Sequence, residues 1–205
     1  MIQIFSGTLL LSILHALIPS HWLPITAMGQ NLKWTSKETL LATLYLGIAH
    51  VGGTLLLGLI FYFVGHELDK NYTAYFEKVV PVGLILIGIV FIYRHHTHHH
   101  FHIDEKEALR KRSTIKIISS LMLLMFFSPC LEVEAYFLMA GKYHISFLVS
   151  LATMYAIITV GGMLLWVSIA MKGLKKTNWH KLEHNAGLIT GVILILTGIV
   201  TYLLD

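Results

Sequence analysis

Cysteine is almost absent from this chain, since Cys130 is the single one among 205 residues. One cysteine cannot form an intramolecular disulfide, and it excludes the paired cysteines of thiol exchange and of thiolate zinc clusters. Charge is also scarce: Asp, Glu, Lys and Arg make up 13% of the residues, whereas a soluble domain is usually about a quarter charged. No Walker motif occurs, and no basic, aromatic-rich surface indicates a nucleic-acid partner.

Hydrophobic residues, by contrast, make up 56% of the chain and are gathered in long segments. A membrane-spanning helix needs about 20 mostly apolar residues. We therefore predict an all-α membrane protein with six transmembrane helices and no separate soluble domain. The predicted helices lie at Ile2–Met28, Thr39–Val64, Val79–Tyr93, Ile115–Ala140, Ile145–Met171 and Ala186–Leu204.

The basic residues are divided unevenly among the connections between these helices. Twelve of the fifteen Lys and Arg fall in or beside the first, third and fifth connections. Basic loops usually stay in the cytoplasm. We therefore expect a multi-pass protein of the cell (inner) membrane, with both termini outside and the third connection, residues 94–114, in the cytoplasm.

The two halves of the chain, residues 1–93 and 115–205, resemble each other. A shift of about 110 residues aligns Pro19 with Pro129 and the pair Gly52-Gly53 with Gly161-Gly162. Each half has three helices, an odd number, so the second half enters the membrane in the opposite sense. This predicts a 3+3 inverted-topology repeat, the arrangement of many secondary transporters; chance recurrence of Gly, Leu and Ile is the alternative.

Both aligned prolines lie inside apolar segments, where proline removes a backbone hydrogen bond and breaks or bends a helix. His15 and His21 flank Pro19. Six residues correspond to roughly 240° around a regular helix, so the two imidazoles can converge only if the helix is broken. Ionisable residues at bilayer depth normally face a cavity or each other.

These polar residues predict a site for a divalent transition metal. Imidazole and carboxylate suit Ni, Co, Zn or Mn better than soft Cu(I). The alternatives are an interhelical hydrogen bond for a histidine such as His50 and simple packing for Cys130. The predicted ligands are His15, His21, His50, Glu132 and Glu134, with Cys130 and Ser20 as secondary candidates.

Two further histidine groups lie outside the membrane segments. Imidazoles at such density chelate Ni, Co, Zn or Cu, although they also serve as proton buffers or pH sensors. The first group is a predicted metal-collecting loop of His95, His96, His98, His99, His100 and His102. The second, a candidate cytoplasmic mouth, consists of His180, Glu183 and His184.

The run HALIPSHWLP at residues 15–24 resembles the first-helix signature of the nickel/cobalt transporter families, most closely the NicO/RcnA type of efflux protein. GIAH at residues 47–50 is similar to their second-helix motif, and SPC at residues 128–130 to a motif of the wider LysE-like superfamily. The resemblance implies that the first-helix histidines bind the metal. It departs at Ser20, where the families have an acidic residue, and a carboxylate of Glu132 or Glu134 is then expected to complete the site.

These observations predict a secondary transporter and no enzyme. We expect efflux of a divalent ion (Ni or Co, with Zn or Mn as further candidates) in exchange for protons, because metal binds only to deprotonated ligands. The second hypothesis is a membrane metalloenzyme or metal-holding subunit. The third is a LysE-like exporter of a small organic or sulfur-containing anion. The sequence leaves open whether the protein forms a homo-oligomer.

Overall fold

The computed structural model describes residues 1–97 and 114–173 and, beyond them, residues 188, 191–192, 194–196, 198–199 and 202. Within these ranges the regular elements are helices, and no strand is present. The helices are α1 (Ile2–Leu17), α2 (Pro19–Asn31), α3 (Ser36–Thr97), α5 (Thr114–Phe126), α6 (Leu131–Ala140) and α7 (Ile145–Gly173). The second histidine group and most of the first lie outside the described residues.

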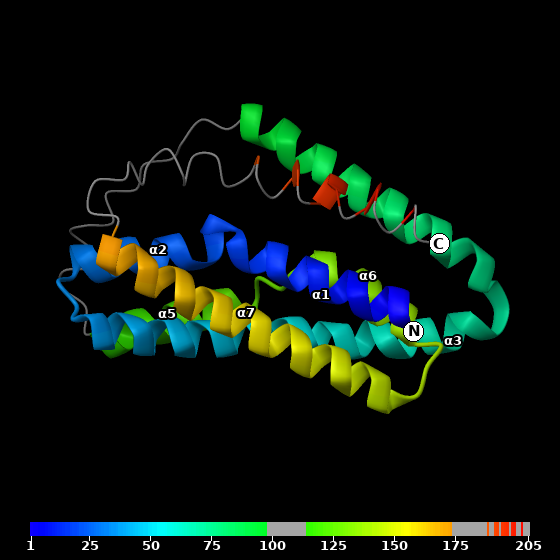
Figure 1. Ribbon diagram of the computed structural model, residues 1–205, viewed down its shortest axis with the longest axis horizontal. Coiled ribbons are helices and arrows are strands. Elements are labelled where there is room, and N and C mark those ends of the chain that lie inside the picture. Colours follow the sequence, from blue (N-terminus) through cyan, green and yellow to red (C-terminus); the bar gives the residue numbers. More distant parts are fainter. Residues whose placement is uncertain are drawn as a thin grey trace.

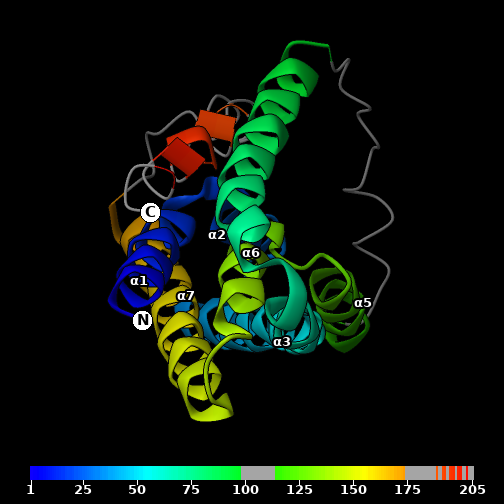
Figure 2. The same ribbon diagram turned by 90° about the vertical axis from the view of Figure 1, so that its right-hand side faces the viewer.

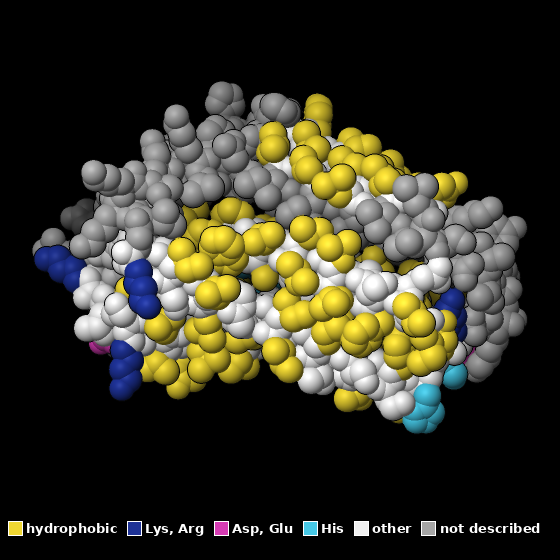
Figure 3. Space-filling view, viewed as in Figure 1, with side chains coloured by type: hydrophobic (Ala, Val, Ile, Leu, Met, Phe, Trp, Pro, Cys, Tyr) yellow, Lys and Arg dark blue, Asp and Glu magenta, His cyan; other side chains and the backbone are white. Residues whose placement is uncertain are grey.

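Three segments of the described chain are long and apolar enough to cross a bilayer: Ile2–Asn31, Ser36–Leu68 and Ile145–Lys172. The shorter helix Thr114–Phe126 is apolar as well. Hydrophobic side chains spread over the flank of the bundle in Figure 3, and the Lys and Arg side chains of that face lie near its two ends. These are the features of an all-α membrane protein.

The predicted connection between the second and third helices is itself helical, because α3 continues through it. The sequence at residues 65–78 holds no proline and includes strong helix formers such as Glu67 and Leu68. A straight helix of 62 residues would be roughly 90 Å long, about three times the hydrocarbon core. Instead, α3 turns back on itself beyond Leu68 (Figures 1 and 2). Its end at Thr97 also places the start of the predicted loop at 94–114 inside a helix.

The two pairs of short helices run in opposite directions along the bundle. The chain passes from α1 to α2 towards one end and from α5 to α6 towards the other (Figure 1). Helix α6 packs against α1, α3 and α7. Its buried face, which includes Val133, Phe137 and Ala140, joins Leu11 and Tyr155 in the largest hydrophobic cluster.

Close approach between helices depends on glycine. A Cβ at Gly53 of α3 would collide with the backbone carbonyl of Phe126, at the end of α5. The approach brings α3 against the break between α5 and α6, and a carbonyl cannot move aside as a flexible side chain does. Gly161 of α7, in contrast, has no atom within 4 Å of the position that its Cβ would occupy.

This difference predicts opposite effects of one substitution at two helical glycines. Gly53→Ala should lower the unfolding midpoint in detergent, because overpacking costs about 1–3 kcal/mol. Gly161→Ala should keep or raise it, since alanine favours a helix by up to about 1 kcal/mol. Equal midpoints for the two variants would contradict the close contact at Gly53.

Candidate metal centre

The first half of the site forms where α1 ends. Ile18 has an extended backbone (φ −64°, ψ 120°) between α1 and α2, and Pro19 is the first residue of α2. The residue before a proline is pushed out of the helical conformation, and proline fits the first helical position because it has no N–H to satisfy. The predicted break at Pro19 is therefore confirmed. It brings the ring centroids of His15 and His21 to within 4.3 Å.

The second half forms at the matching break, between α5 and α6. Helix α5 ends at Phe126, and residues 127–130, which include Pro129, are not helical. Cys130 has an extended backbone (φ −87°, ψ 102°) and caps the start of α6. The break at Pro129 is confirmed as well, and it turns the Cys130 side chain towards the interior.

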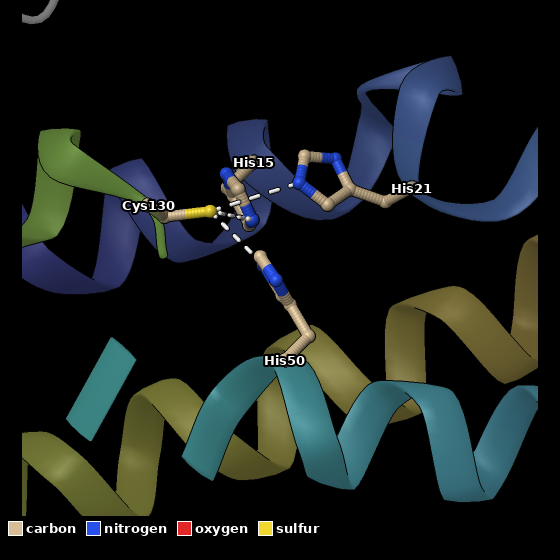
Figure 4. A group of neighbouring side chains, drawn as sticks. All are labelled: His15, His21, His50 and Cys130. Carbon is tan, nitrogen blue, oxygen red and sulfur yellow. Dashed lines mark hydrogen bonds between the residues drawn. The ribbon is translucent and has the colours of Figure 1, made fainter. Parts of the chain in front are cut away.

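Cys130 and three histidines converge at the meeting point of these breaks (Figure 4). The Cys130 Sγ lies 3.0 Å from Nε2 of His50, 3.1 Å from Nε2 of His15 and 3.6 Å from Nε2 of His21. The four donor atoms all lie within 4.8 Å of one another. His15, His50 and Cys130 are buried, whereas His21 is half-buried. We call this group the metal centre.

The distances from the Cys130 sulfur to the three imidazoles are close to those of a tetrahedral coordination shell. With metal–sulfur and metal–nitrogen distances of about 2.3 and 2.0–2.1 Å, tetrahedral sulfur and nitrogen ligands lie about 3.6 Å apart. One of the three observed distances equals that value, and the other two are about half an ångström shorter. Small outward movements of His15 and His50 would admit an ion, so the group can hold a metal.

The environment of His50 fixes which ring nitrogen faces the centre. Its Nδ1 lies 3.4 Å from the carbonyl oxygen of Met125, which can only accept a hydrogen bond. Met125 is in the last turn of α5, and its carbonyl, which also accepts from the backbone N–H of Ser128 (3.3 Å), has a second lone pair for His50. With Nδ1 donating to this carbonyl, the Nε2 lone pair is left for the metal, as is usual for metal-binding histidines.

Thr54 connects the two halves of the centre. Its hydroxyl donates to the carbonyl of His50 (3.0 Å) and accepts from the backbone N–H of Cys130 (3.2 Å). Thr54 is fully buried and lies one helical turn after His50. Sequence reasoning missed it, although its spacing of four residues from His50 is a signal that could have found it.

The remaining predicted residues lie outside this group. Glu134 is 2% exposed and Glu132 is half-buried, and neither belongs to the four-residue cluster found among the described residues. A carboxylate ligand therefore stays a prediction. The side chain of Ser20 is not described. Tyr155, which was not predicted, places its ring 6.0 Å from that of His15.

Comparisons with known proteins add no relative of this chain. No family model, no curated protein and no solved structure matches it.

Loading the purified protein with Co²⁺ tests the donor set. A tetrahedral site with one thiolate should give intense visible d–d bands and a sulfur-to-cobalt charge-transfer band. Cys130→Ser should abolish the charge-transfer band, whereas His144→Ala, at an exposed histidine, should leave the spectrum unchanged. A Cys130→Ser spectrum identical to that of the wild type would exclude the thiolate.

Thr54→Val keeps the shape of this side chain but removes both of its hydrogen bonds. We expect the Co²⁺ affinity to fall roughly 10- to 100-fold, as for other residues that orient metal ligands. Thr153→Val is a matched control, because the hydroxyl of Thr153 also bonds its own helix (2.8 Å to Val149) but is exposed. An equal loss in both variants would show that Thr54 has no orienting role.

Proposed function

We propose that the protein is a secondary transporter that exports a divalent transition-metal ion in exchange for protons. The observation that carries the proposal is the place of the metal centre: His15, His21 and Cys130 stand at two helix breaks, and His50 of α3 meets them in the interior of an apolar bundle. Backbone that is not helical is tolerated at membrane depth where it is buried in protein or lines a cavity. Transporters bind their substrates at such interrupted helices.

Two equivalent glycine contacts support the inverted repeat. Gly53 of α3 packs on Phe126 at the end of α5, and Gly162 of α7 packs on Ala16 at the end of α1. The shift of about 110 residues that aligns the prolines converts one contact into the other. The opposite directions of α1–α2 and α5–α6 agree with this relation. Six spans would then be the two broken pairs, the two arms of α3, α7 and the predicted sixth helix at Ala186–Leu204, most of which lies outside the described residues.

The ends of the bundle support the predicted orientation. The turn between α2 and α3, the start of α5 and the end of α7 lie at the same end (Figure 1). That end carries Lys33, Lys37, Lys116 and Lys172, whereas Lys142 follows α6 at the other end. The lysine-rich end is the cytoplasmic one in our proposal, and the histidine-rich segment after α3 would collect ions there.

The donor atoms of the centre indicate which divalent ions it would prefer. Three imidazoles and a thiolate in tetrahedral arrangement suit Zn²⁺ and Co²⁺, and Mn²⁺ prefers oxygen ligands. Ni²⁺, which the family resemblance implies, ranks behind Zn²⁺ and Co²⁺. A thiol that coordinates such an ion loses its proton, so binding expels a proton and reprotonation favours release. This is the proposed basis of proton exchange.

A metal-holding membrane subunit is the second candidate. The four protein ligands complete a tetrahedral shell, as in structural zinc sites, whereas a catalytic site keeps one position open. That reading predicts a stoichiometric ion that exchanges slowly. The anion exporter ranks last, because none of the lysines whose side chains the structure describes is buried to receive an anion.

Ion flux into proteoliposomes tests the transport proposal. Purified protein should move Zn²⁺ or Co²⁺ into the liposomes faster when the lumen is more acidic than the outer solution, so that protons leave as the metal ion enters, than without a pH gradient. His15→Ala/His21→Ala should reduce the flux to that of empty liposomes, because the centre loses two ligands, and His144→Ala should transport normally. Tightly bound metal without flux of Zn²⁺, Co²⁺, Ni²⁺ or Mn²⁺ would favour the metal-holding subunit instead.

A further inference from the structure

Glu134 is the buried acidic residue that the metal centre leaves unexplained. Its side chain is 2% exposed, and neither carboxylate oxygen has a hydrogen-bond partner among the described residues. Removing a carboxylate from water without a hydrogen bond or an opposite charge is costly. Such a group stays protonated and neutral unless a positive charge comes close to it, so its ionisation would be coupled to the arrival of a cation.

The helix places Glu134 close to the metal centre. Cys130 is the residue that precedes the first turn of α6, and Glu134 lies in that turn, four residues later. Within a helix this spacing brings Cβ atoms to about 5–6 Å, so Glu134 belongs to the end of α6 that lies next to the metal centre. None of the described lysine side chains is buried beside Glu134, whereas an ion bound at the centre would bring a positive charge into the same interior.

A count of charges shows what this carboxylate would do. Neutral imidazoles and one thiolate leave a divalent ion with a net charge of +1, whereas a monovalent ion such as Cu⁺ or Ag⁺ is neutralised by the thiolate alone. A residual charge is expensive in an apolar interior, and a carboxylate within a few ångströms offsets it. Thiolate by itself would favour the soft monovalent ions.

We propose that Glu134 supplies the second negative charge of the occupied centre and thereby makes the site selective for divalent over monovalent soft metal ions. The inference rests on the proposed function, because it states whether the same centre binds divalent or monovalent ions. Glu134 acts on the ion without needing to coordinate it. Glu132 is the other acidic residue in the first turn of α6, and its side chain is half-buried, whereas that of Glu134 is 2% exposed and lacks a hydrogen-bond partner among the described residues.

Equilibrium binding of two probe ions to the purified full-length protein tests this role. Glu134→Gln should weaken Co²⁺ binding about tenfold or more while leaving Ag⁺ binding within about twofold. Glu134→Asp keeps the charge and should retain most of the Co²⁺ affinity. Glu38→Gln removes the same charge from an exposed position and should change neither affinity.

The outcomes separate this inference from the transport proposal. Unchanged Co²⁺ affinity in Glu134→Gln, or equal weakening for Co²⁺ and Ag⁺, overturns the inference, because the first shows no charge effect and the second shows general damage to the centre. The same loss in Glu132→Gln overturns the assignment to Glu134. Absence of flux with the Co²⁺/Ag⁺ difference intact overturns transport and supports the charge role.

Discussion

The structure depends on the requirement that backbone polar groups inside an apolar bundle find partners. Pro19 and Pro129 make this requirement hard to meet at two places, because a regular helix is interrupted at each of them and its backbone hydrogen bonds are lost there. The interruptions are tolerated because they are buried against each other and against polar side chains. Thr54 binds the Cys130 N–H, and the end of α5 turns the Met125 carbonyl towards His50. The breaks and the metal centre are therefore one feature.

Two glycines allow the helices that carry the ligands to approach each other closely. At Gly53 and Gly162 two helices approach so closely that a Cβ would overlap the neighbour. The approach at Gly53 carries His50, one turn away, to the Cys130 sulfur. Helix packing in membranes has little hydrophobic driving force, so such contacts between small residues carry much of the association. The glycine pairs thus serve both the bundle and the position of the ligands.

A transporter must both bind its metal ion and release it. Four convergent donor atoms could hold an ion firmly, and a closed shell is also what a storage or structural site would have. Transport would require that the ligands separate, and they come from four different helices or helix breaks. Charge contributes to the same balance, because an ion and its ligands must be nearly neutral to stay in an apolar interior.

The sequence alone predicted the helical membrane class, both helix breaks and the three histidines that gather at the candidate centre, because these follow from local apolar length, from proline chemistry and from the cost of imidazoles in a bilayer. It ranked Cys130 only as a secondary candidate ligand, it missed Thr54, and it did not show that the connection within α3 is helical. Only the tertiary structure could decide these points: Cys130 meets His15 across 115 residues and His50 across 80. Such contacts are set by how helices pack, which local residue patterns do not encode.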